Sequence, residues 1–80
     1  MAVGNSNMQI TVKLYGSLCI GRFNSALCEY PDHCTVLTIV KSLGIPSEYL
    51  IRLRNGSHVQ FDEVVQDGDT ISLLPMLDGG

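Results

Sequence analysis

The chain has 80 residues, a formal net charge of −3 and only five basic residues. This length allows one small domain, and the lack of a basic run argues against a nucleic-acid partner. No apolar run approaches the roughly 20 residues that a membrane span requires. Met1–Asn7 does not have the pattern of a signal peptide. The three cysteines are odd in number and lack metal-ligand spacing, so we expect reduced thiols and a cytoplasmic location.

The N-terminal third predicts a disordered leader and a β-hairpin. Residues 1–7 are small and polar and form the expected leader. Apolar and polar residues alternate over Met8–Tyr15, which predicts a strand with one buried face. Gly16–Asn24 has no sustained pattern and is expected to be a loop. Ser25–Tyr30 is then expected to return as the antiparallel partner strand.

The middle of the chain predicts one helix. Thr35 occupies the N-cap position, and apolar residues follow at helical spacing as far as Leu43. Gly44 supplies the C-terminal stop, and Pro46 prevents the helix from continuing. Because the apolar residues are mostly β-branched and form helices poorly, this helix must be stabilised by packing against a sheet.

The second half predicts three more strands. Leu50–Arg54 and Ser57–Phe61 flank Asn55-Gly56, a strong hairpin-turn signal. Asp67-Gly68-Asp69 is a further turn, and Thr70–Leu74 is the last strand. The expected fold is therefore α+β, a β-grasp (ubiquitin-like) domain with a mixed four- to five-stranded sheet packed on one helix. The first and last strands are expected to pair in parallel at its centre.

The C-terminal end contains the most distinctive residues. We expect residues 8–75 to form the domain and residues 76–80 to form a flexible tail that ends in Gly79-Gly80. Pro75 marks the point where strand pairing must weaken, and the residues from there to Gly80 can extend about 20 Å. Glycines pass through channels too narrow for other residues. Taken by itself, this pattern also fits an ordinary frayed terminus.

The combination of these features resembles the MoaD/ThiS family of ubiquitin-like sulfur carriers. The resemblance rests on the Asn55-Gly56 hairpin, the run from Asp67 to Pro75 and the terminal Gly79-Gly80. Pro75, directly after the last strand, makes this chain more similar to the MoaD branch of the family, which is the small subunit of molybdopterin synthase.

The resemblance implies a function for the tail. An E1-like enzyme would use ATP to adenylate the carboxylate of Gly80, and a sulfur donor would convert it to a thiocarboxylate. Gly79 would let the tail enter the partner's active site. The sulfur would be delivered to the large synthase subunit, or to another acceptor enzyme, in molybdopterin (molybdenum or tungsten cofactor) synthesis. The chain itself would be a carrier and not an enzyme, with no bound cofactor or metal.

Apolar residues beside the tail predict where partners would bind. We expect the partner-binding segment to comprise Leu74, Pro75, Met76, Leu77 and Asp78, with Tyr15 extending the apolar surface. Alternatively, Leu77 folds back onto the domain and this surface does not form.

Other functions remain open at this point. The carrier could serve thiazole, tRNA or amino-acid synthesis, or the chain could be a protein modifier or a non-catalytic interaction module. The Arg52/Arg54 pair is a weaker candidate for partner contacts. The adjacent His33 and Cys34 lack further metal ligands. The carboxylates before the last strand are expected to form a solvated acidic edge, which comprises Asp62, Glu63, Asp67 and Asp69.

Overall fold

A computed structural model describes residues 7–76 of the chain. In that range, no helix is long and apolar enough to cross a membrane. The elements in chain order are β1 (Asn7–Leu14), the 3-10 helix η1 (Gly16–Cys19), β2 (Ser25–Pro31), α1 (Val36–Ser42), β3 (Leu50–Arg54), β4 (Ser57–His58) and β5 (Thr70–Pro75).

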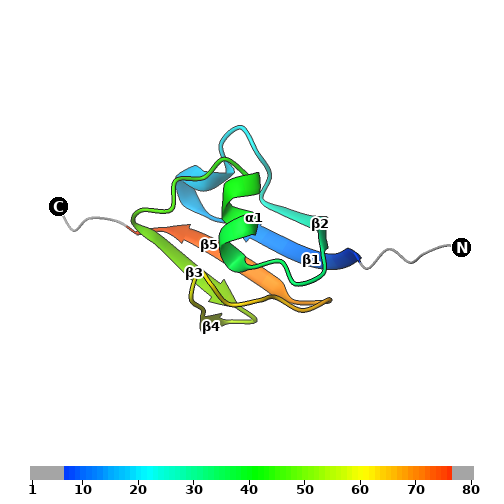
Figure 1. Ribbon diagram of the computed structural model, residues 1–80. Coiled ribbons are helices and arrows are strands. Elements are labelled where there is room, and N and C mark those ends of the chain that lie inside the picture. Colours follow the sequence, from blue (N-terminus) through cyan, green and yellow to red (C-terminus); the bar gives the residue numbers. More distant parts are fainter. Residues whose placement is uncertain (1–6, 77–80) are drawn as a thin grey trace, which may run out of the picture.

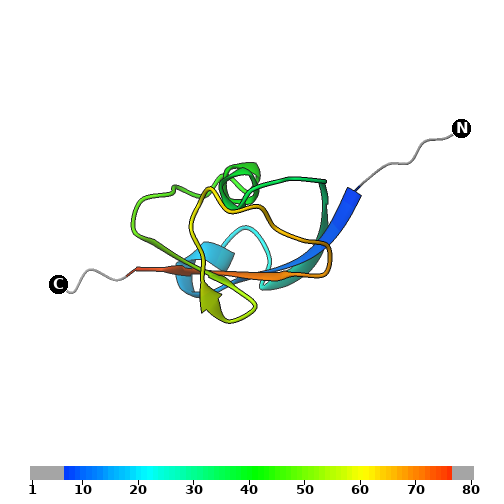
Figure 2. The ribbon, with the colours of Figure 1, turned by 60° about the horizontal axis from the view of Figure 1, so that its bottom comes forward.

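The strands form one mixed sheet in the order β2-β1-β5-β3-β4 (Figure 1). The central strands β1 and β5 are parallel, in a register that pairs Thr11 with Thr70 and Leu14 with Leu73. The other neighbouring strands are antiparallel. The rotated view in Figure 2 shows that α1 lies on one face of this sheet. The predicted β-grasp fold is therefore confirmed, including the central parallel pair.

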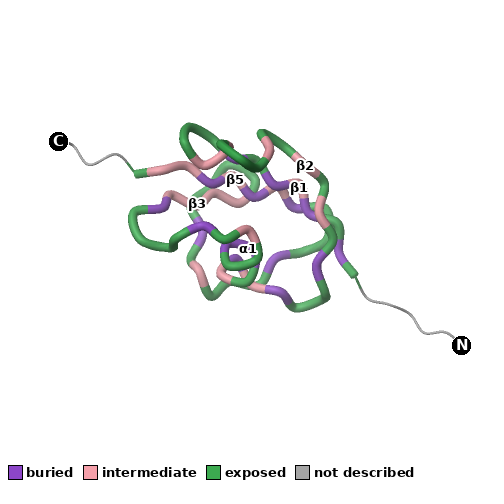
Figure 3. Tube along the Cα trace, turned by 90° about the horizontal axis from the view of Figure 1, so that it is seen from above, coloured by how far each residue is buried: buried purple, intermediate pink, exposed green. Residues whose placement is uncertain are grey.

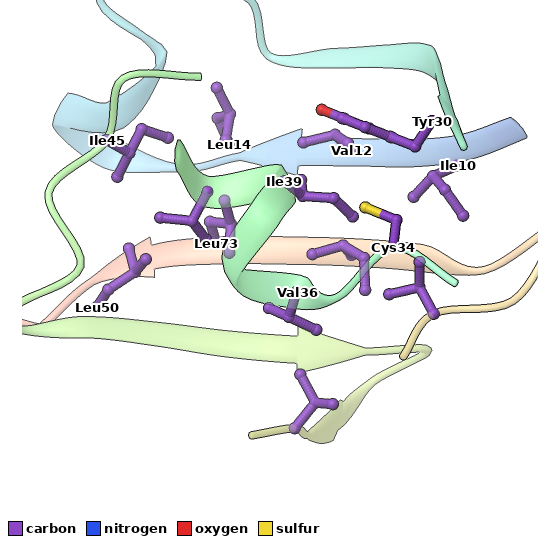
Figure 4. Packing of buried hydrophobic residues seen from close by; sticks show 14 of the residues in the cluster. Ile10, Val12, Leu14, Tyr30, Cys34, Val36, Ile39, Ile45, Leu50 and Leu73 are labelled. Atoms are coloured by element: carbon purple, nitrogen blue, oxygen red, sulfur yellow. The ribbon is translucent and has the colours of Figure 1, made fainter. Parts of the chain in front are cut away.

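The core lies between α1 and the sheet. Buried positions alternate along β1 and β5, as the period-two pattern predicts (Figure 3). Val36, Ile39 and Val40 of α1 are fully buried against this face (Figure 4). The strand residues that are fully buried are Ile10, Val12, Ile71 and Leu73. Burial of each of these apolar side chains contributes about 1.5–3 kcal/mol, which offsets the weak helix propensity of α1.

Both ends of α1 are held by side chains. Thr35 is the N-cap, and its hydroxyl oxygen accepts a hydrogen bond from the Thr38 N–H at 3.3 Å. At the other end, the Arg22 guanidinium donates to the carbonyl oxygens of Leu43 at 3.0 Å and Gly44 at 3.2 Å. A cation at a helix C-terminus also complements the helix dipole. Arg22 therefore ties the β1–β2 connection to the helix.

Several boundaries differ from the sequence prediction, including one-residue shifts at Leu14, Pro31 and Pro75, where β1, β2 and β5 end. The first strand begins at Asn7, which was predicted to belong to the leader, because Asn7 pairs with Pro31. The connection predicted as a loop begins with η1. The strand predicted to extend from Ser57 to Phe61 contains only Ser57 and His58.

The chain leaves the sheet after His58 because the helix needs its backbone groups. The carbonyl oxygens of Phe61 and Glu63 accept hydrogen bonds from the N–H groups of Leu37 and Val36, at 2.9 and 3.1 Å. These donors lie in the first turn of α1 and have no partner within the helix. The segment therefore satisfies the helix N-terminus instead of extending the sheet.

The prediction of a solvated acidic edge is wrong for Asp69, which is only 7% exposed. Its carboxylate accepts hydrogen bonds from Arg54 Nε at 2.7 Å, the Gln66 N–H at 2.8 Å and Asn55 Nδ2 at 3.0 Å. Burial alone raises the pKa of Asp69. The hydrogen bonds from Gln66 and Asn55 and the charge of Arg54 outweigh burial and hold that pKa below its usual value.

We predict that Asp69→Asn lowers the free energy of unfolding by about 3 kcal/mol at pH 7, because it leaves Arg54 without its buried partner. A carboxylate whose pKa is lowered in the folded state stabilises the fold fully above its unfolded pKa of about 3.9. That contribution disappears as the pH falls through the folded-state pKa. Urea denaturation should therefore show that the difference in the free energy of unfolding between wild type and variant becomes smaller as the pH falls from 7 into the acid range.

The exposed Asp62 provides the matched control. Asp62→Asn removes the same charge from the same segment and should change the stability little. Equal effects of the two substitutions would contradict the role assigned to Asp69.

Candidate functional site

The tail leaves the domain from the centre of the sheet. β5 lies between β1 and β3, and hydrogen bonds hold it as far as the last described residue. The Leu73 carbonyl oxygen accepts from the Tyr15 N–H at 3.1 Å, and the Met76 N–H donates to the Tyr49 carbonyl oxygen at 2.8 Å. The chain that follows Met76 therefore starts from a fixed point.

Pro75 is packed against the start of η1. It is half-buried and pairs with Leu50 on β3. On its other side, a Cβ at Gly16 would lie only 3.0 Å from Pro75 Cγ, and Gly16 has a φ of 60°. Both the close approach and the positive φ require glycine at position 16. Pro75 thus ends the strand, as predicted, and it also forms a packing contact that fixes the exit.

Apolar side chains surround this exit. Leu74 pairs with Ile51 on the sheet face opposite α1, and both are half-buried. Tyr15 and Met76 are 44% and 48% exposed, and Tyr49 is 76% exposed. We call these five residues the tail-exit patch: Tyr15, Tyr49, Ile51, Leu74 and Met76. Three of these five residues are exposed, and groups of exposed apolar residues are typical of an interaction site.

The backbone of Tyr49 adds an unusual feature to the patch. Its φ is 58°, a left-handed conformation that costs about 1–2 kcal/mol in residues other than glycine. Its side chain is largely exposed, while its carbonyl oxygen binds Met76. Strained residues are enriched at functional sites, which is consistent with a role for this position in partner contacts.

The structure places only some of the predicted site residues. Leu74, Pro75 and Met76 lie together at the exit. The other predicted residues, Leu77, Asp78, Gly79 and Gly80, lie outside the described residues.

Sequence reasoning missed Tyr49, Ile51 and Gly16. The sequence of β3 does not show which face is buried, because its two arginines lie on the same side of the sheet as α1, together with Leu50. Arg52 lies over the Phe61 ring, 3.9 Å from its centroid, and Arg52 Nε donates to the Val59 carbonyl oxygen. With Arg54 held by Asp69, neither arginine is free to act as a simple surface cation. Assigning β3 by alternation from Leu50 would have placed Ile51 on the sheet face opposite α1, the face of Leu74.

The candidate thiol of Cys34 is not activated in the structure. Cys34 is buried, and burial raises the pKa of its thiol, so it stays protonated at neutral pH. From Asn7 to Met76, the structure brings together no group of three potential metal ligands. The tail exit is therefore the candidate functional site.

We predict that Gly16→Ala lowers the free energy of unfolding by about 2 kcal/mol and shifts the NMR resonances of Pro75 and Met76. The new Cβ would combine a strained backbone with a clash against the proline ring. Gly21→Ala is the control, because Gly21 has a φ of 74° but nothing within 4 Å of the added Cβ. If both variants change the Met76 resonance equally, the packing contact does not fix the exit.

Comparison with known proteins supports a family assignment. The model of the ThiS family matches residues 12–80. The HVO 2177 protein of Haloferax volcanii has the same fold, with a TM-score of 0.83, 20% identity, and coverage of 100% of this chain and 93% of that one. Small archaeal modifier protein 1 of H. volcanii gives 0.74 and 20%, with coverage of 88% and 99%.

A third structure contains a partner. It is the complex of subunits 1 and 2 of the molybdopterin-converting factor of Helicobacter pylori. The TM-score is 0.63 at 22% identity, and the match covers 91% of this chain and all of the matched chain. At these identities the three structures establish a shared fold.

Proposed function

The chain belongs to the ThiS family of small ubiquitin-like carriers and modifiers, and on that premise we propose that it carries sulfur on the carboxylate of Gly80. The resemblance to the MoaD/ThiS family is thereby confirmed. The observation that carries the proposal is the fixed exit of β5, which is held through Met76. Residues 77–80 can extend at most about 14 Å from this point. That reach suits a terminus that must enter another protein's active site.

The proposed chemistry needs two partners. In an E1-like enzyme, a carboxylate oxygen of Gly80 attacks the α-phosphorus of ATP and releases pyrophosphate, which gives an acyl adenylate. A persulfide sulfur then attacks the acyl carbon and AMP leaves. Cleavage of the remaining sulfur–sulfur bond by a thiol leaves the thiocarboxylate and a disulfide. The active sites supply the catalysis and exclude water from the reactive acyl group.

We propose molybdopterin synthesis as the pathway. Pro75 after the last strand is the sequence feature that favours this branch, and the fold is shared with subunit 1 of a molybdopterin-converting factor. The acceptor would be a large synthase subunit that binds the tail-exit patch. Aromatic and methionine side chains are enriched at such interfaces, and Tyr15, Tyr49 and Met76 provide them.

A protein modifier is the second candidate. The fold is shared with a small archaeal modifier protein, and a modifier would use the same first step at Gly80. The two functions differ in the nucleophile that displaces AMP. A sulfur nucleophile gives a carrier, whereas delivery to a lysine amine gives a conjugate.

We predict that incubation with an E1-like enzyme, ATP and a persulfide donor replaces one oxygen of the chain by sulfur. Intact-mass measurement detects this change, and alkylation of the thiocarboxylate confirms it. Deletion of Gly80 should abolish the product and leave the fold unchanged, since the core lies within residues 8–73.

Circular dichroism of the truncated chain provides the folding control. A folded truncated chain that still acquires sulfur would contradict the role of Gly80. A ladder of lysine conjugates without a thiocarboxylate product would favour the modifier.

We also predict that Met76→Ser weakens binding to the large synthase subunit about tenfold, because it removes one apolar contact at the exit. Val64→Ser is the matched control, since Val64 is 41% exposed and pairs with Thr35 at the N-terminus of α1. Isothermal titration calorimetry measures both. Equal affinities of the two variants would exclude the tail-exit patch as the binding surface.

A further inference from the structure

The outer edge of β2 presents backbone groups that have no partner among the described residues 7–76. β2 is an edge strand that pairs with β1 over seven residue pairs, from Asn7–Pro31 to Lys13–Ser25. The Leu14 N–H donates to the Asn24 carbonyl oxygen. Because hydrogen-bonded and non-hydrogen-bonded residue pairs alternate along an antiparallel ladder, this bond identifies which residues of β2 bond to β1. Ala26, Cys28 and Tyr30 therefore direct their backbone groups toward β1. The N–H and C=O groups of Ser25, Leu27 and Glu29 point away from the sheet.

This edge has little of the usual protection against pairing. Natural edge strands are shortened, bulged, interrupted by proline, or protected by charged side chains, of which β2 has only Glu29. The other edge strand, β4, has only two residues. In contrast, β2 has a continuous register, and its residues before Pro31 include no lysine or proline. Leu27 is 63% exposed in the middle of this edge.

We propose that the edge of β2 pairs with β2 of a second copy of this chain in an antiparallel, two-fold symmetric dimer with Leu27 on the axis. In this register Leu27 faces Leu27 of the second copy, and Ser25 faces Glu29. Each of these pairs joins residues whose backbone groups point outward, so each pair exchanges two hydrogen bonds. All of the outward groups of Ser25, Leu27 and Glu29 are then satisfied.

The side chains in this register are also complementary. The exposed Leu27 side chains cover each other at the axis. Glu29 lies opposite a serine hydroxyl, and Ser25 is itself paired with Lys13 on β1. The carboxylate of Glu29 thus lies in the same cross-strand row as the Lys13 ammonium of the other copy. These charges are two strand spacings apart, roughly 10 Å, so their attraction is a small contribution to the pairing.

The neighbouring registers are poorer. With Glu29 on the axis, two carboxylates face each other, and Leu27 would face Pro31, which has no N–H to donate. With Ser25 on the axis, Leu27 would face Phe23, which lies outside the strand. The register centred on Leu27 is the one that uses the whole strand.

The proposed dimer contact is confined to β2. β1 separates β2 from β5, so the tail-exit patch is not part of the new contact. The inference is therefore independent of sulfur transfer. A single pair of edge strands buries less surface than a standard interface of about 1,600 Å², so we expect a weak dimer that depends on concentration.

Sedimentation and amide hydrogen exchange of the full chain test the proposal. The average mass should rise toward that of a dimer as the concentration increases to about 1 mM. Over the same range, exchange should slow at the N–H groups of Ser25, Leu27 and Glu29 and stay constant at Ala26 and Cys28. A chain that remains monomeric, or a dimer that protects other amides, would overturn the proposal.

Charge substitutions at the axis provide a second test. Leu27→Lys and Leu27→Glu should each weaken the dimer at least about tenfold, because like charges then face each other. An equimolar mixture of the two variants should restore dimerisation through a Lys–Glu pair. Val64→Lys adds a charge at another exposed apolar residue and should leave the wild-type dimer unchanged. Failure of the mixture to dimerise would contradict the two-fold pairing at Leu27.

Discussion

The buried carboxylate of Asp69 connects the hairpin at the end of β3 with the segment just before β5. It receives hydrogen bonds from Arg54 at the end of β3, from Asn55 in the hairpin turn and from the backbone of Gln66. The Asn55 side chain in turn accepts from the Thr70 N–H at 2.9 Å. Because a buried charge is stable only when its hydrogen bonds are satisfied, these groups must occupy one arrangement. That arrangement sets where β5 begins and which residues it pairs with.

The two ends of β5 are fixed by different physical means. Its start is held by an ionic network, and its end is held by the packing of Pro75 on Gly16 and by the hydrogen bond from Met76. A strand fixed at both ends, between two neighbours, gives the chain a constant position as far as Met76. The apolar tail-exit patch lies around that position, so a partner can bind the domain and the tail together.

The local patterns of the sequence were sufficient to predict the layers of the fold. The alternation in β1 and the N-cap at Thr35 depend on neighbouring residues, and both are confirmed. The short β4 and the burial of Asp69 depend on contacts between distant segments, which no local pattern contains. The arginines of β3 mislead for the same reason, since their position on the helix side depends on Phe61, Val59 and Asp69. At the site, Leu74, Pro75 and Met76 were predictable, whereas Tyr49 and Gly16 became evident only from the fold.

The parallel pairing of β1 with β5 has a consequence for folding. The strand that completes the centre of the sheet comes last among the strands, so β1 and β3 have no common neighbour until β5 inserts between them. Such a pairing joins residues far apart in sequence and forms slowly. Insertion of β5 completes the core and also brings the tail-exit patch together, since Leu74 and Met76 meet Ile51 and Tyr49 only then. A partner that requires the whole patch would therefore bind completely folded molecules and would not bind partly folded ones.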